Sequence, residues 1–383
     1  MRRKVFAVLC IIGIIIAGCS VCFAQGTIIE MPEIKIIIDG EQKPFSDVPI
    51  VANSRTLLPL RQILVYLGVP NDDQHIIWDQ TTQSVTVKHN GTEIYLKLYD
   101  NTAKVNGRIV TLDVQSTAYK NRTYIPARFA SEVLNKKVEW DGRIKAVYIT
   151  NNDVYQHTSD TLGMFASSMR DVTDCAYTVK CNIKLASSSA SKSAEYVYLT
   201  NVKSDFFANI THVVFKGPAQ KSVDFEAYYM PNRVYTKIAG GEWIKDSFES
   251  DDIIGKIGLL GKCASIGNEF ACVGLKADEA LSNDKEAVLK GELLFEPTSA
   301  QIGFLLGSTS TVLDEESGYT TDIKKTTTTM YLDKNTNRVN KILANVTGVV
   351  AGNSGKRYSL NAEVAYEFAG YNQGIKLAVP SAK

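Results

Sequence analysis

An internal repeat between residues 30 and 150 constrains the fold of this chain more than any other feature. Residues 53–61 read N-S-R-T-L-L-P-L-R, and residues 120–128 read K-N-R-T-Y-I-P-A-R, 67 positions later. Downstream, Trp78-Asp79 recurs as Trp140-Asp141 after 62 positions, so the second copy has a shorter loop. Several anchors in one order and near one spacing predict two copies of one supersecondary unit.

Each copy is predicted to form a hairpin, a short helix and a second hairpin. Asp39-Gly40 in the first copy and Asn106-Gly107 in the second supply the positive φ angles that tight hairpin turns require. Pro59 and Pro126 suit the first position of a helix, where a missing N–H costs nothing. Apolar residues at helical spacing follow both prolines.

This repeat resembles the copper amine oxidase N-terminal domain, a stalk-like module common in secreted proteins of Gram-positive bacteria. The resemblance rests on the twofold R-T-hydrophobic-hydrophobic-P-x-R pattern, followed each time by W-D and an alternating strand. It covers residues 30–150 and carries no information about chemistry, because in the oxidases this domain lies away from the active site.

Oxidase activity itself is not expected. The resemblance would imply copper held by three His and a Tyr-derived quinone within Asn-Tyr-Asp, and imidazole is a ligand that suits copper. The chain has four scattered histidines and no Asn-Tyr-Asp. We therefore predict a protein that is not an enzyme, with no catalytic residue, no metal and no cofactor. The histidines are His75, His89, His157 and His212.

Two sets of repeated residues allow a functional and a structural interpretation. The arginines could contact anions or glycans, or they could pair with Asp79, Asp141 or a turn carbonyl and fasten helix to hairpin. Trp78 and Trp140 could stack on sugars, or they could pack a hairpin onto its helix. Repetition at equivalent positions favours the structural interpretation in both cases. The arginines are Arg55, Arg61, Arg122 and Arg128.

The N-terminus predicts secretion. A basic start is followed by a short apolar run and small residues, which is typical of a signal peptide over residues 1–24. Cleavage after Ala24 leaves four cysteines, an even number that suits an oxidising compartment. The alternative is a lipobox ending at Cys19, which would then carry a lipid anchor. Either route predicts an extracytoplasmic protein, secreted or on the cell surface, without a transmembrane span in the mature chain.

Residues 151–383 predict one large antiparallel sheet with helices on one face. Asn151-Asn152-Asp153 starts a helix, and apolar residues occupy every second position from Tyr358 to Phe368. Helical patterns interrupt the strands at residues 251–260, 277–289 and 299–306. The strand layout resembles the LolA-like lipoprotein-carrier group and related uncharacterised Gram-positive lipoproteins, which implies a curved half-barrel over an apolar cavity.

The expected fold class is therefore α+β. A small tandem-repeat hairpin-helix-hairpin domain at 30–150 precedes a large antiparallel half-barrel at 151–383. Cys263 and Cys272, nine residues apart around a turn, are a candidate disulfide. Cys175 and Cys181 would lie about 20 Å apart on one strand, which is too far for them to pair with each other. The alternatives are that they pair with the other two cysteines or that they stay buried and reduced.

The predicted function is binding of a hydrophobic, lipid-like small molecule or a cell-envelope component, without catalysis. The alternative is a structural wall or matrix protein whose core is filled by its own side chains. Lys and Arg number 42 against 41 Asp and Glu, a balance that excludes an electrostatically driven nucleic-acid binder. Residues 299–306 are apolar around most of a helix, which favours a second covered surface. The candidate cavity residues are Met164, Phe165, Met169, Ile302, Phe304 and Leu305.

Overall fold

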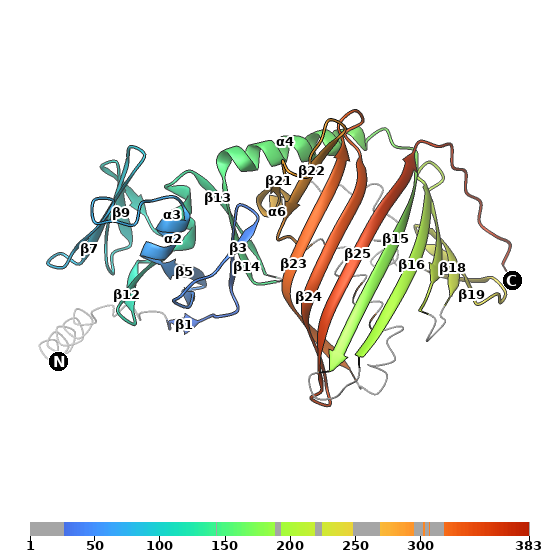
Figure 1. Ribbon diagram of the computed structural model, residues 1–383, viewed down its shortest axis with the longest axis horizontal. Helices are drawn as coiled ribbons and strands as arrows, with labels where there is room; N and C mark the ends of the chain where they lie inside the picture. Colours follow the sequence, from blue (N-terminus) through green and yellow to red (C-terminus); the bar gives the residue numbers. More distant parts are fainter. Residues whose placement is uncertain are drawn as a thin grey trace, which may run out of the picture. The chain divides into compact units, whose positions relative to one another are not determined.

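The computed structural model describes residues 27–142, 144–187, 193–218, 224–247, 269–294, 302, 306 and 318–382 (Figure 1). Its contacts group into two compact units. The first holds residues up to Pro32 together with Phe45–Ala130, and the second holds Glu33–Pro44 together with Ser131–Lys383. No helix in the described ranges is long and apolar enough to cross a membrane. The predicted signal peptide at 1–24, with Cys19, lies outside the described residues.

The first unit contains two five-stranded sheets and a short helix α2 (Leu60–Tyr66). In spatial order, one sheet consists of β1 (Ile29–Glu30), β4 (Ile50–Ala52), β5 (Arg55–Pro59), β12 (Arg122–Pro126) and β11 (Thr117–Tyr119). The other consists of β10 (Arg108–Thr111), β9 (Thr102–Val105), β8 (Thr92–Lys97), β7 (Ser84–His89) and β6 (Ile76–Asp79). A second short helix, α3 (Ala127–Glu132), follows β12.

The two copies of the repeat pair with each other through β5 and β12. Leu58 lies opposite Ile125, its own equivalent 67 positions later, and the neighbouring pairs are symmetric about this point. Ion pairs also cross between the copies: Arg55 Nε lies 2.5 Å from Asp113, and Arg122 Nε lies 3.3 Å from Asp47. Neither ion pair involves Asp79 or Asp141. Arg55 Nη1 also donates to the Ser54 carbonyl at 3.4 Å, a turn carbonyl of the kind that the prediction allowed.

The predicted hairpin–helix–hairpin unit is not confirmed as a self-contained module. Its local elements occur in both copies, but the terminal hairpins pair with strands of the other copy. In the second unit, β2 (Lys35–Ile38) and β3 (Glu41–Lys43) come from copy one. They share a sheet with β13 (Lys136–Asp141) and β14 (Ala146–Asn151) of copy two, and β2 pairs in parallel with β14.

The hairpin turns follow the sequence prediction, whereas the prolines differ by one position. Asp39 and Gly40 have φ angles of 48° and 75°, and Asn106 and Gly107 have 50° and 78°. Pro59 ends β5 and lies opposite Tyr124 in the ladder, so α2 begins only at Leu60. The ψ angle of Pro59 is 117°, an extended value that keeps this residue in the strand.

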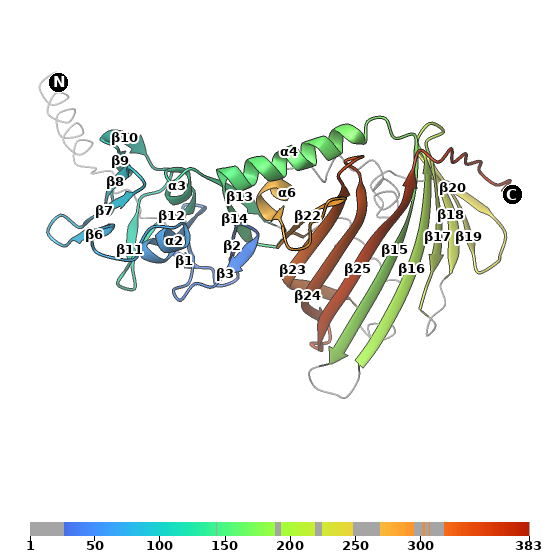
Figure 2. The ribbon, with the colours of Figure 1, turned by 45° about the horizontal axis from the view of Figure 1, so that its top comes forward.

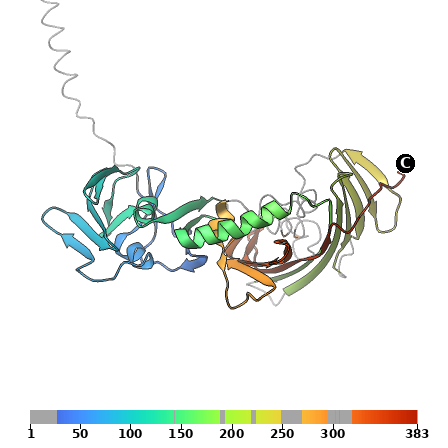
Figure 3. The ribbon, with the colours of Figure 1, turned by 90° about the horizontal axis from the view of Figure 1, so that it is seen from above.

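The second unit is dominated by an eleven-stranded antiparallel sheet, which curves around one face (Figures 2 and 3). The fold is mostly β, with α4 (Asn152–Ser168) and α6 (Glu269–Gly274) beside the sheet. In spatial order the strands are β20 (Ile244–Ser247), β19 (Arg233–Ile238), β18 (Phe225–Met230), β17 (Ile210–Lys216), β16 (Ser193–Asp205), β15 (Asp174–Ser187), β25 (Arg357–Tyr371), β24 (Val339–Gly352), β23 (Tyr319–Asp333), β22 (Glu286–Gly291) and β21 (Lys276–Ala277).

The helix predicted at residues 277–289 is wrong, because residues 278–285 connect β21 to β22 and residues 286–289 belong to β22. Asn283 Oδ1 accepts hydrogen bonds from the backbone N–H groups of Lys285 and Glu286, both at 2.9 Å. Short polar side chains that bond the nearby backbone compete with helix formation in this way. The helix predicted at 251–260 lies outside the described residues, and of residues 299–306 only Ile302 and Leu306 are described, both helical.

Asp39 ties the β2–β3 turn to the start of α4. Its carboxylate accepts hydrogen bonds from Thr150 Oγ1 at 3.0 Å, from the Asn151 backbone N–H at 2.8 Å and from Asn151 Nδ2 at 2.7 Å. Hydrogen bonds to a charged group contribute more than neutral ones.

We expect Asp39→Asn to destabilise the second unit by about 1–2 kcal/mol, because an amide nitrogen cannot accept the third bond. The reverse swap in the other copy, Asn106→Asp, keeps the acceptor oxygen that receives the Glu93 N–H at 2.7 Å, so little change is expected there. Urea denaturation of both variants measures the difference. Equal stability of the two would contradict the role of Asp39.

Candidate ligand-binding face

The two faces of the eleven-stranded sheet differ in chemistry. On the outer face, Glu367 of β25 pairs with Lys180 at 3.2 Å and Lys341 at 3.6 Å, and Glu195 pairs with Lys184 at 3.3 Å. Residues of the opposite parity along β15, β16, β24 and β25 are mostly buried and mostly apolar, with Thr200 and Ser204 of β16 as buried polar members. The sheet therefore carries one polar face and one apolar face, which we call the inner face.

The centre of the inner face is rich in tyrosine. Tyr177 and Phe368 have ring centroids 5.2 Å apart, and Tyr198 lies 6.2 Å from Phe215. These rings belong to one hydrophobic cluster that extends across the sheet. The residues of β15, β16 and β25 in this cluster are Cys175, Tyr177, Val179, Cys181, Ile183, Leu185, Tyr196, Tyr198, Val202, Tyr358, Leu360, Ala362, Val364 and Tyr366.

Three of the predicted cavity residues lie in this same cluster. Phe165 lies in α4, Met169 is the C-cap residue directly after α4, and both are buried in the cluster together with Ile302. Burial of this kind is expected of a solid core and of a lined cavity alike. Met164 differs from these three: it is 51% exposed and outside the cluster, because it is turned about 100° around the helix from Phe165. Phe304 and Leu305 lie outside the described residues.

The apolar inner face continues to an exposed rim at β18, β19 and β20. Phe225 stacks on Phe215 at 4.9 Å and lies opposite Ile238 of β19. Ile244 of β20 lies opposite Thr236, which shares the face of Ile238. Ile238 and Ile244 are both 61% exposed, their direct neighbours Phe225 and Thr236 are half-buried, and Phe215 and Ala227 are buried. We call Ile238 and Ile244 the rim. The sequence prediction missed the rim, although the alternation of Val234, Thr236 and Ile238 indicates that these side chains share one face of a strand.

The cysteines on the inner face are buried. Cys175 and Cys181 are buried on the same strand, six residues apart, in accordance with the prediction that they do not pair. Burial raises the pKa of the Cys181 thiol far above its ordinary value, so the thiolate is disfavoured. Cys272 is buried, and Cys263 lies outside the described residues, so the disulfide remains a prediction. The described ranges contain no cluster of side chains suited to a metal ion.

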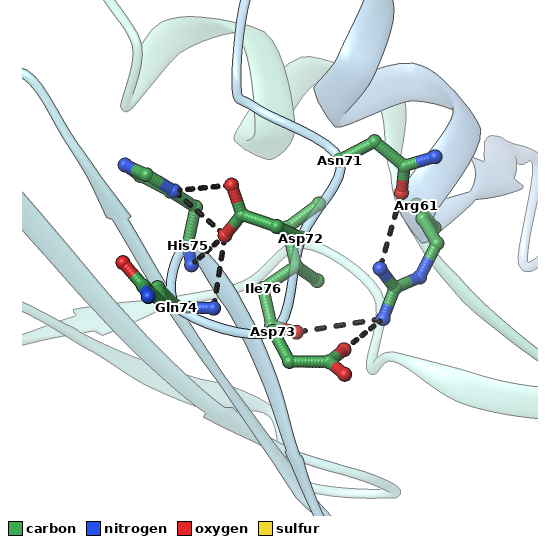
Figure 4. Close-up of polar contacts among 7 residues, drawn as sticks. All are labelled: Arg61, Asn71, Asp72, Asp73, Gln74, His75 and Ile76. Carbon is green, nitrogen blue, oxygen red and sulfur yellow. Dashed lines mark hydrogen bonds and ion pairs between the residues drawn. The ribbon is translucent and has the colours of Figure 1, made fainter.

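The repeated polar residues of the first unit have structural partners. Arg61 Nη1 donates to Asn71 Oδ1 at 3.1 Å, and Nη2 donates to the Ile76 carbonyl at 3.4 Å (Figure 4). This contact fastens α2 to β6, as predicted for the arginines. In the same loop, Asp72 accepts a hydrogen bond from the His75 backbone N–H at 2.9 Å, and His75 Nδ1 lies 2.8 Å from its carboxylate (Figure 4).

Comparison with known proteins gives one family match and several structural neighbours. Residues 37–149 match the model of the copper amine oxidase N-terminal domain, which confirms the resemblance predicted for the repeat. No match is found among curated proteins.

The structural neighbours include a lipoprotein-sorting protein and a LolA superfamily protein. A domain described as an outer membrane lipoprotein-sorting protein from Vibrio parahaemolyticus is 8% identical, with a TM-score of 0.22, over 58% of this chain and 95% of its own. A DUF1329 family protein from Desulfovibrio piger is 9% identical, with a TM-score of 0.21, over 58% and 95%. A LolA superfamily protein from Nitrosomonas europaea is 10% identical, with a TM-score of 0.20, over 58% and 94%.

Proposed function

We propose that this is an extracytoplasmic, non-enzymatic protein whose eleven-stranded sheet binds an apolar, lipid-like ligand on its inner face. The observation that carries the proposal is the exposed rim. Ile238 and Ile244 continue the apolar inner face to a position open to solvent, where a ligand can begin to bury its own apolar surface. Tyrosine rings farther in provide rigid apolar area with polar ends.

A substitution at the rim tests this proposal without disturbing the core. Because Ile238 is largely exposed, Ile238→Asp should fold normally. A charge there must be desolvated when an acyl chain passes over it, so uptake of a fluorescent fatty-acyl probe should weaken at least about tenfold. Probe fluorescence at increasing protein concentration measures the apparent Kd.

The matched control is Val197→Asp, which places the same charge on the outer face. Val197 is 58% exposed and lies opposite Asn182, so both variants alter a β-branched residue of similar exposure on the same sheet. The control should bind the probe as the wild type does. If the wild type takes up no probe, the alternative of a structural protein with a solid core replaces this proposal.

Processing and compartment are also proposed, on sequence grounds. We infer cleavage after Ala24 and export from the cytoplasm, with lipidation at Cys19 as the alternative. The intact mass of the native mature protein distinguishes the two, because a diacylglyceryl cysteine adds a large and characteristic mass. The intact mass after alkylation, measured with and without prior reduction, shows whether Cys263 and Cys272 are joined by a disulfide.

A further inference from the structure

Two of the three tryptophans are partly exposed to solvent. Trp243 is occupied: Tyr228 lies edge-on at 5.5 Å, and Lys237 Nζ lies 5.9 Å from the ring centroid. Trp78 and Trp140 are 39% and 42% exposed, and within the described ranges no aromatic ring or cation stacks on either. Each of these residues is therefore partly covered and partly exposed, and its packing between hairpin and helix stays a prediction.

The repeat places both tryptophans in the same setting. Each lies on an edge strand of its sheet, Trp78 on β6 and Trp140 on β13. Each lies opposite a buried valine of the neighbouring strand. Each is also followed by a turn that ends at a residue with a φ of 52°, Gln83 in the first copy and Lys145 in the second. Equivalent local structure in the two copies thus produces equivalent exposure of the indole.

The turn beside Trp78 consists of uncharged polar residues. The Asp79 carboxylate that precedes it accepts hydrogen bonds from the backbone N–H groups of Thr81 and Thr82, at 2.8 Å and 3.3 Å. Gln80 Oε1 accepts the indole N–H at 2.9 Å, and residues 80–83, Gln-Thr-Thr-Gln, are all exposed. Amide and hydroxyl groups both donate and accept hydrogen bonds. A flat apolar ring beside such groups suits a sugar, which presents C–H groups on its faces and hydroxyl groups around its edge.

We propose that Trp78 and the turn at residues 80–83 form a binding site for a neutral carbohydrate, and that Trp140 repeats its stacking surface. In the Trp140 copy, Gly142 takes the place of Gln80, and a Cβ there would lie 3.4 Å from the indole nitrogen. That copy lacks the amide side chain, so Trp140 contributes less than Trp78.

Binding of two defined sugars to the full chain tests the proposal. The probes are the β-1,4-linked hexamers of glucose and of N-acetylglucosamine, followed by calorimetry and by intrinsic tryptophan fluorescence. Wild type should bind at least one probe saturably. Trp78→Ala should weaken binding at least about tenfold, as loss of a central aromatic contact does, and Trp140→Ala should weaken it less. Trp78→Phe keeps a ring and should retain intermediate affinity.

The control is Ile109→Ala, which removes an exposed apolar side chain from β10 at the other edge of the Trp78 sheet. Ile109 is 72% exposed, so this variant tests whether loss of any exposed apolar surface matters. It should bind as the wild type does, and thermal unfolding should show all variants folded. Three results would each overturn the proposal: no saturable binding by wild type, undiminished binding by the Trp78→Ala/Trp140→Ala double variant, or equal loss in Ile109→Ala.

Discussion

Gly291→Ala is expected to destabilise the second unit by about 3–5 kcal/mol, among the largest effects of any single substitution. A Cβ at Gly291 would stand 2.0 Å from the Gly274 carbonyl oxygen and 3.2 Å from Leu275 Cα, both backbone atoms that cannot move aside cheaply. Gly40 approaches the same carbonyl, so the β2–β3 turn, α6 and β22 meet at one glycine-lined crossing. Chemical denaturation followed by circular dichroism measures the change.

Gly163→Ala in α4 is the control for this substitution. A Cβ there meets nothing within 4 Å, and alanine favours a helix interior over glycine by about 1 kcal/mol. This variant should be as stable as the wild type or slightly more stable. If Gly291→Ala matched it, the close backbone crossing would not exist in solution.

A fragment of residues 151–383 is expected to be unstable, although this is the predicted extent of the half-barrel domain. Ile37, Ile144, Ala146 and Tyr148 belong to the same hydrophobic cluster as the inner face, and the fragment lacks all four. Several buried apolar side chains lost together cost more than the usual total stability of a domain. Soluble yield and cooperative thermal unfolding are the measurements.

A rejoined chain provides the comparison for that fragment. Residues 33–44 linked by a flexible Gly-Ser segment to residues 131–383 contain all of the second unit and omit only the first. This chain should unfold cooperatively. Equal stability of the 151–383 fragment would show that the predicted boundary is the correct one and that β2, β3, β13 and β14 add nothing to the core.

Local structure was the part of the fold that the sequence could predict. Asp39-Gly40 and Asn106-Gly107 determine their turns through their own backbone preferences, and the alternation along β25 determines which side of that strand is buried. The sequence could not predict that hairpins of one copy pair with strands of the other. Pairing within a copy and pairing between copies would use the same repeated strands. The choice depends on contacts such as Asp39 with Asn151, which lie far apart in the chain.

The candidate site was predicted in part for a similar reason. Burial of Phe165 and Met169 followed from helical spacing, because apolar residues on one side of a helix face a core. Exposure of Ile238, Ile244 and Trp78 depends on which strands lie at the edge of a sheet. Strand order is a property of the assembled sheet, so an apolar residue in an alternating pattern looks the same whether its strand is central or at the edge.

Native mass spectrometry of the full chain with a fatty acid such as palmitate tests the central claim most directly. Our proposal predicts a one-to-one complex with the wild type and with Val197→Asp, and a much weaker complex with Ile238→Asp. A wild-type protein that shows only the mass of the bare chain, both as purified from its native source and after incubation with palmitate, would contradict ligand binding by the inner face.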